Sequence, residues 1–129
     1  MLTQITKQIF LGDLDDVLDA PNKGVTAVIN VAKELNDPYL PNVKQVKIGL
    51  EDDSIPQVPL INIAVNVLTS LINNGDVVLV HCAMGLSRSP YIVARYFANK
   101  NRVSVSRSYQ ELKQKYPLTD EESPLRCNP

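Results

Sequence analysis

The chain has 129 residues, of which 44% are hydrophobic and 21% are charged, and this size and composition fit one globular domain. Its formal net charge is −1, so no overall positive field favours nucleic acid as a partner. No apolar run is long enough to span a membrane, and the first residues lack the apolar core of a signal peptide. We therefore expect an intracellular, cytoplasmic protein without a membrane partner.

Strand and helix patterns alternate along the chain. Strands are predicted over residues 4–11, 25–32, 43–50 and 77–80, from apolar runs at 25–32 and 77–80 and from alternation at Val46 and Ile48. Helical spacing predicts helices over 58–74, 90–98 and 104–115. Residues 14–20 fit a short acidic helix or turn that Pro21 stops, and residues 33–42 fit a turn-rich loop. This order predicts one α/β domain over residues 1–129, with a mainly parallel central sheet of four to five strands flanked by helices. Residues 118–129 are expected to form an irregular C-terminal tail.

One stretch stands out between the strand at 77–80 and the helix at 90–98. It reads His81-Cys82-Ala83-Met84-Gly85-Leu86-Ser87-Arg88-Ser89. Backbone N–H groups in such a loop can point inward and hold an anion, and the N-terminus of the following helix adds partial positive charge. Gly85 permits a tight turn, and Arg88 offers a planar fork that matches two phosphate oxygens. In that positive field Cys82 is a candidate thiolate nucleophile.

Single residues of this stretch also have a plainer interpretation. A cysteine at the end of a strand is commonly a small buried apolar residue, and a lone histidine commonly has a structural role. Here a histidine, a cysteine, a glycine, an arginine and a serine occur together between a strand and a helix. That joint pattern favours a phosphate-binding loop.

The pattern His-Cys-x5-Arg-Ser resembles the signature of the cysteine-dependent protein phosphatases, and residues 81–90 are most similar to their dual-specificity branch. Looser similarity at residues 9–12 and 28–31 extends the resemblance over most of residues 5–117. The resemblance implies that Cys82 forms a phosphocysteine intermediate without a cofactor or a metal ion. It also implies that the phosphate is held by Ala83, Met84, Gly85, Leu86, Ser87 and Arg88.

Three further residues are expected to support this chemistry. His81 is expected to order the region around Cys82, and Ser89 to donate a hydrogen bond to the departing thiolate. The resemblance implies that Asn30 braces the phosphate loop from the next strand. Asn30 could equally be an ordinary polar residue near a strand end, so both interpretations stay open.

The leaving oxygen needs an acid that protonates it. The family places an aspartate about thirty residues before the cysteine, on a loop after a strand, and Asp52 stands there. The family pattern of an apolar residue, any residue and then aspartate fits residues 50–52, so we favour Asp52 over Asp53, with Glu51 third. The plainer alternative is a solvated acidic turn.

The resemblance implies hydrolysis of phosphotyrosine, and of phosphoserine or phosphothreonine, in phosphorylated proteins or peptides. A monomer is expected. The alternatives are a phosphatase for RNA 5′ ends or phosphoinositides, a rhodanese-like sulfurtransferase, and a phosphoprotein-binding module. Relatives that act on lipid or RNA often carry extra basic residues in the loop, whereas Ala83, Met84 and Leu86 are neutral. A binding module is expected to lack Cys82 or Arg88, and both are present.

The chain has two cysteines, Cys82 and Cys127. A disulfide between them would consume the nucleophile, so reduced thiols are expected. Cys127 lies two residues from the C-terminal residue, and we expect it to be a tail residue without a role.

Overall fold

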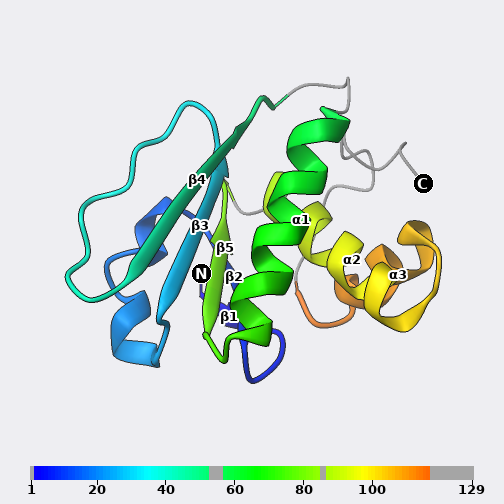
Figure 1. The fold of residues 1–129 in the computed structure, drawn as a ribbon, viewed down its shortest axis with the longest axis horizontal. Coiled ribbons are helices and arrows are strands. Elements are labelled where there is room, and N and C mark those ends of the chain that lie inside the picture. The colour runs from blue at the N-terminus through cyan, green and yellow to red at the C-terminus, as the bar shows by residue number, and fades with distance from the viewer. Residues whose placement is uncertain (1, 53–56, 85–86, 117–129) are drawn as a thin grey trace.

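A five-stranded sheet forms the centre of the computed structural model, which describes residues 2–52, 57–84 and 87–116 (Figure 1). Its strands are β1 (Thr3–Gln4), β2 (Ile9–Gly12), β3 (Ala27–Ala32), β4 (Lys44–Leu50) and β5 (Val78–His81), in the order β1-β2-β5-β3-β4. All neighbouring pairs are parallel except β1 and β2, which are antiparallel. The predicted mainly parallel sheet is therefore confirmed.

Three α-helices cover one face of this sheet (Figure 1). They are α1 (Val58–Asn73), α2 (Arg88–Asn101) and α3 (Val105–Lys113). On the inner face of α1, Ile61, Ala64, Val65 and Leu68 are buried, which is the helical spacing that the sequence shows. The helices pack against alternate residues of the parallel strands, as expected for side chains that point to opposite faces of a strand.

The other face carries two short 3₁₀ helices, η1 (Leu14–Asp16) and η2 (Ala20–Lys23), and the loop over residues 33–43. A smaller apolar cluster fills this side, with Val17, Val28, Leu40 and Leu79 among its members. The sheet is thus buried on both faces, as is usual for a parallel sheet.

The prediction of one strand over residues 4–11 is wrong. The backbone N–H groups of Ile5 and Thr6 both donate to the carbonyl oxygen of Ile9, at 2.8 and 3.2 Å, and this turn separates β1 from β2. The prediction that Pro21 stops the first helical segment is also wrong, because Pro21 lies in the first turn of η2. Proline is tolerated there because the first N–H groups of a helix have no partner within the helix.

The register of the parallel strands brings their carboxyl ends to one edge of the sheet. Gly12 of β2 and Asn30 of β3 both pair with His81, the last residue of β5, and Ala32 pairs with Leu50 at the end of β4. The loops that follow these strands therefore leave the sheet side by side, where sites of such sheets form. No helix within the described part of the chain is both long and apolar enough to cross a bilayer.

Candidate active site

Cys82 follows directly after β5 and begins the loop that leads into α2. Cys82 is 2% exposed, and Ser89 is fully buried. The Sγ atom of Cys82 lies 3.3 Å from the hydroxyl oxygen of Ser89. The Ser89 hydroxyl is thus placed where it can donate to a thiolate at Sγ. The expected pairing of these two side chains is present.

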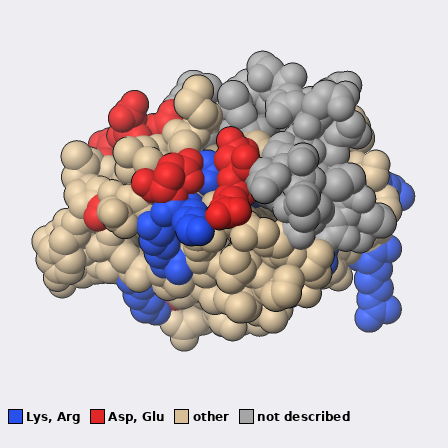
Figure 2. Space-filling view, turned by 90° about the horizontal axis from the view of Figure 1, so that it is seen from above, with Lys and Arg blue, Asp and Glu red and all other residues tan. Residues whose placement is uncertain are grey.

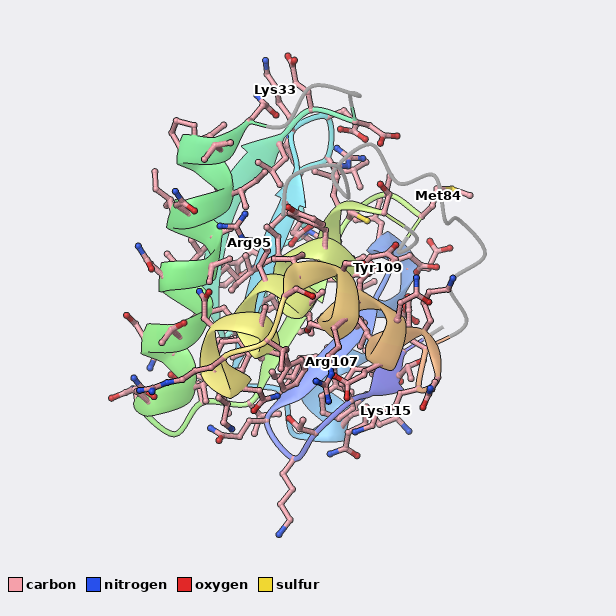
Figure 3. All side chains as sticks on the ribbon, turned by 90° about the vertical axis from the view of Figure 1, so that its right-hand side faces the viewer. Lys33, Met84, Arg95, Arg107, Tyr109 and Lys115 are labelled. Carbon is pink, nitrogen blue, oxygen red and sulfur yellow. The ribbon has the colours of Figure 1, made fainter. Side chains whose placement is uncertain are left out.

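The loop between Cys82 and α2 is partly described. Ala83 and Ser87 are half-buried, and Met84 is 72% exposed at the outer edge of the loop (Figure 3). Gly85 and Leu86, to which we assigned loop amides, lie outside the described residues. Cys127 and the expected tail at 118–129 lie outside them as well.

Arg88 opens α2 and is 2% exposed. Its Nη1 donates to Glu34 Oε1 and to the carbonyl oxygen of Leu50, each at 2.8 Å, and its Nη2 donates to Glu34 Oε2 at 2.7 Å. Within the described chain these bonds use both Nη1 protons and one Nη2 proton. The Nε proton and the second Nη2 proton remain, and they share one edge of the planar guanidinium. That edge can bind two oxygens of one phosphate group.

The Glu34–Arg88 pair stays charged over a wide pH range. The hydrogen bond from Arg88 lowers the pKa of Glu34 from 4.5 to about 2, although partial burial acts in the opposite direction. The hydrogen bond to Glu34 likewise raises the pKa of Arg88. Figure 2 shows acidic and basic atoms side by side at this end of the molecule. Sequence analysis missed Glu34, because a glutamate in a turn-rich loop carries no signal for a partner 54 residues away.

His81 is fully buried, and each of its ring nitrogens lies near an oxygen atom. Nε2 is 2.9 Å from Asp37 Oδ2, and Nδ1 is 3.3 Å from the carbonyl oxygen of Cys82. His81 therefore links the loop over residues 33–43 to the backbone of Cys82, and its role in ordering this region stays a prediction. Asp37 was not identified from the sequence, where it is one more polar residue of a loop.

Asn30 bonds to the turn after β3, whereas the resemblance implied that it braces the phosphate loop. Its Nδ2 donates to the carbonyl oxygen of Leu35, and its Oδ1 accepts from the backbone N–H of Ala32, both at 2.8 Å. These bonds shape the turn after β3, and that turn carries Glu34. The Asn30 side chain therefore bonds to the turn that carries Glu34, the partner of Arg88.

Asp52 is exposed on the loop that follows β4. Its charge is one of the smaller causes that raise the pKa of Arg88, after the hydrogen bond from Arg88 to Glu34. The preceding residue is anchored twice: Glu51 N donates to Gln57 Oε1 at 2.6 Å, and Lys33 Nζ lies 2.9 Å from Glu51 Oε1. The alternative acid, Asp53, lies outside the described residues.

Tyr116 is a further residue near Cys82 that sequence analysis did not single out. It is 5% exposed, and burial raises its pKa to about 12, with the charges of Cys82, Asp13 and Asp16 adding to the effect. The phenol therefore stays neutral. The described residues contain no group of three His, Cys, Asp or Glu side chains that could hold a metal ion.

Comparison with known proteins gives a consistent result. Residues 9–124 match the family model described as dual specificity phosphatase, catalytic domain. Human dual specificity protein phosphatase 1 is 33% identical over 101 residues, which are 78% of this chain and 27% of that protein. Dual specificity protein phosphatase OPG106 of vaccinia virus is 27% identical over 112 residues, covering 84% of this chain and 66% of that protein.

Solved structures share the fold. The crystal structure of human DUSP28 superposes with a TM-score of 0.85 at 20% sequence identity, covering 98% of this chain and 88% of that one. The matched segment spans about a quarter of the length of human dual specificity protein phosphatase 1, as the 27% coverage shows.

Proposed function

This chain belongs to the dual specificity phosphatase family, whose catalytic-domain model matches most of its length, and from that premise we propose that it hydrolyses phosphate monoesters on proteins. The observation that supports the proposal best is a buried cysteine and a buried arginine at the two ends of one loop. Both lie at the carboxyl edge of the sheet, and Arg88 keeps one edge of its fork for an anion.

The proposed reaction has two steps. The thiolate of Cys82 attacks phosphorus and forms an S–P bond, while the bond to the leaving oxygen breaks and Asp52 donates its proton to that oxygen. Water then attacks the phosphocysteine, with Asp52 as the base, and the Cys82 sulfur leaves as a thiolate stabilised by the Ser89 hydroxyl. Arg88 and the loop amides stabilise the charge on the phosphoryl oxygens in both transition states.

We propose that the substrates are phosphotyrosine and also phosphoserine or phosphothreonine in proteins. Tyr39, the aromatic residue of the loop over residues 33–42, is 82% exposed and does not form the wall of a deep cleft. A shallow site lets phosphate on a short side chain reach Cys82. Phosphotyrosine is expected to react faster, because a phenol with a pKa of about 10 is a better leaving group than an alkoxide.

The oligomeric state and the compartment are part of the same proposal. We propose a monomer, because all the groups used in the reaction come from one chain. We also propose a reducing compartment such as the cytoplasm, because Cys82 has to remain a thiol.

The test is release of phosphate from peptides that differ only in phosphotyrosine, phosphothreonine or phosphoserine, with a chelator present. We expect turnover of all three, fastest for phosphotyrosine, and none with Cys82→Ser. The Cys82→Ser variant should still bind vanadate, because Arg88 and the loop amides hold the anion without the sulfur. Retained turnover in this variant would exclude Cys82 as the nucleophile.

The same assay includes a phosphoinositide and a 5′-triphosphorylated RNA. Faster turnover of either one than of the peptides would replace the proposed protein substrate. Turnover of phosphotyrosine alone would restrict the protein to tyrosine-directed activity.

A further inference from the structure

A hollow of about 250 Å³ lies at the amino end of the sheet, outside the candidate active site. The turn between β1 and β2 lines one side of it, and the end of α1 and the second half of α2 line the other. Ile9, which lines the hollow, pairs with Val78 at the start of β5, whereas Cys82 follows the end of that strand. The hollow and the candidate nucleophile are therefore at opposite ends of the sheet, the lower and the upper end in Figure 1.

The hollow is apolar at its base and basic at its edge. Ile9 and Tyr96 are at most 7% exposed, and Phe97 is half-buried against the main core. Lys7 of the β1–β2 turn and Lys100 of α2 also line the hollow, and both are exposed. Within the described part of the chain neither lysine makes a hydrogen bond or an ion pair. No acidic residue is among the described residues that line this hollow.

A second hollow, of about 240 Å³, adjoins the first, because Thr6 and Phe97 line both. It lies between the β1–β2 turn, α2 and α3, and the exposed Lys115 stands at its edge. Its acidic residue, Glu111, has a cation of its own, since its Oε1 lies 3.8 Å from Arg107 Nε. The basic edge of the first hollow thus continues into the second.

Positive charge is concentrated at this end of the molecule. Residues 95–116 contain six basic side chains and one acidic side chain, although the net charge of the whole chain is −1. Figure 3 shows Arg107 and Lys115 at the end away from Met84, which belongs to the loop after Cys82. Several surface cations along one path attract an anionic chain. An apolar base between two cations fits a segment in which an apolar side chain stands among carboxylates.

From this arrangement we propose that the hollow is a docking site for a segment of the protein substrate in which an apolar side chain lies between acidic residues. The apolar side chain enters the hollow beside Phe97, and carboxylates on its two sides pair with Lys7 and Lys100. This inference rests on the proposed function, in which the substrate is a phosphorylated protein. Docking raises the local concentration of the phosphorylated residue at Cys82 and leaves the chemical step unchanged.

The length of α2 sets the reach that such a substrate needs. Lys100 lies twelve residues after Arg88 on this helix, which is a distance of about 18 Å along its axis. An extended chain advances about 3.3 Å per residue, so a link of about ten to fifteen residues passes around the surface between the two sites. A short phosphopeptide does not reach the hollow, and it therefore serves as a control for the chemical step.

Binding is tested first, without catalysis, on a pool of random peptides that carry no phosphate. At about 50 mM salt, where screening is weak, we expect the retained peptides to be enriched in aspartate and glutamate next to leucine, isoleucine or phenylalanine. A retained peptide should bind Lys7→Glu and Lys100→Glu about fivefold to tenfold more weakly than the unaltered protein. The matched control is Lys23→Glu, which reverses the charge of an exposed lysine in η2, on the other face of the sheet. It should bind as the unaltered protein does.

Steady-state kinetics then connect the two sites. A phosphotyrosine peptide is joined to a retained segment through a glycine-serine link of about twelve residues. Its KM should be about tenfold lower than that of the short phosphotyrosine peptide, with kcat unchanged, because docking adds binding that does not change during the reaction. In Lys7→Glu and Lys100→Glu the KM of the joined peptide should rise toward that of the short peptide. Unchanged turnover of the short peptide shows that both variants are folded.

The proposal is overturned if the retained peptides lack acidic residues, if they bind Lys7→Glu and Lys100→Glu as tightly as Lys23→Glu, or if the joined segment does not lower KM. Tighter binding of a single-stranded RNA than of the retained peptides also overturns it and assigns this face to nucleic acid. A dimer that Lys100→Glu dissociates overturns it as well and assigns the face to a second copy of the chain. If the peptides dock as expected but no phosphate ester is hydrolysed, the proposed function fails and the docking site stands.

Discussion

At the scale of single residues, Arg88 is held by three hydrogen bonds to Glu34 and Leu50 before any substrate arrives. These bonds fix the plane of the guanidinium, so the edge that carries Nε is already oriented. A group fixed in this way does not have to reorganise during the reaction, which is the condition for strong transition-state stabilisation. The value of Arg88 therefore lies in its planar shape as much as in its charge.

We predict that Arg88→Lys loses nearly as much activity as Arg88→Ala, about 10²-fold or more in kcat/KM. A single ammonium group cannot bind Glu34, the Leu50 carbonyl and a phosphate edge together. Steady-state kinetics with a phosphotyrosine peptide decide this. The matched control is Arg95→Lys on the same helix, because Arg95 lies about two turns further along α2 and bonds to Asn62 of α1 at 3.2 Å (Figure 3). If the activity of Arg88→Lys stays within about tenfold of the original value, Arg88 does not bind phosphate through two hydrogen bonds.

We predict that Asp52→Asn slows substrates with poor leaving groups by about 10²–10⁴-fold and aryl phosphates with good leaving groups far less. An acid matters most when the leaving oxygen is basic. The matched variant is Asp53→Asn, which removes the neighbouring carboxylate. Rates are measured on a series of aryl phosphates and on phosphoserine peptides. A larger leaving-group dependence in the Asp53 variant would move the role by one residue.

The residues of the candidate site differ in how far the sequence reveals them. Cys82 and Arg88 belong to one short motif between a strand and a helix, so their proximity follows from local structure. Glu34 and Asp37 come from an irregular loop, 54 and 44 residues away from Arg88 and His81. Loops without periodicity do not report which side chain turns inward, so neither partner could be predicted.

At the scale of elements, the turn after β3 connects Asn30 of that strand with Arg88 of α2 through Glu34. Asn30 makes two hydrogen bonds of 2.8 Å within this turn. The same turn carries Glu34, which accepts hydrogen bonds from Arg88. The sequence left two interpretations of Asn30 open, and a substitution at this position tests whether this residue of β3 also supports the site.

We predict that Asn30→Ala lowers the free energy of unfolding by about 1–3 kcal/mol, because the Leu35 carbonyl and the Ala32 N–H lose a buried partner. Activity should fall as well, since Glu34 is then less well placed. The matched control is Asn36→Ala in the following loop, whose exposed side chain accepts from Lys47 at 3.0 Å and should change the free energy of unfolding by less than about 0.5 kcal/mol. Urea unfolding and kcat/KM are compared for both variants. Equal stability of the two variants would contradict a bracing role for Asn30.

The helices α1 and α3 were predictable because each buries one face at helical spacing and is bounded by a clear signal. The bounds of α2 were less predictable, because it is buried on most sides and extends over Arg88–Asn101 rather than 90–98. Ser104 caps α3 by accepting from Arg107 N at 3.1 Å, and Gly75 follows α1 with a positive φ of 88°. The division between β1 and β2 was not predictable, because the polar residues 6–8 between Ile5 and Ile9 include no glycine or proline that would signal a turn. A hydrophobic pattern reports burial, and Ile5 is buried although it lies in a turn.

At the scale of the whole molecule, the Glu34–Arg88 pair links stability to pH. The pKa of Glu34 is lowered to about 2 from the ordinary 4.5. A group with a lowered pKa in the folded state stabilises the fold above its ordinary pKa, and this contribution is lost as the pH falls through the folded value. The relevant range is therefore from 4.5 down to about 2.

We predict that Glu34→Gln melts at a lower temperature than the unaltered protein at about pH 6, and that the difference shrinks as the pH falls through this range. The Glu34 side chain is 51% exposed, so solvent screening reduces the effect. The control is Glu111→Gln, whose carboxylate is 60% exposed and 3.8 Å from Arg107 Nε. Thermal melts at several pH values give the answer, and a difference that stays constant with pH would contradict the linkage.

The exposure of Tyr39 allows the loop beside the site to be followed by tyrosine fluorescence. The chain has five tyrosines and no tryptophan. Tyr91, Tyr96, Tyr109 and Tyr116 are at most 7% exposed, whereas Tyr39 is 82% exposed and lies two residues after Asp37. Intrinsic emission therefore comes from phenol rings alone, and a collisional quencher such as iodide reaches chiefly one of them. Nitration under mild conditions should likewise modify that ring first. Tyr39 can therefore serve as an intrinsic optical reporter close in sequence to Asp37, the partner of the buried His81.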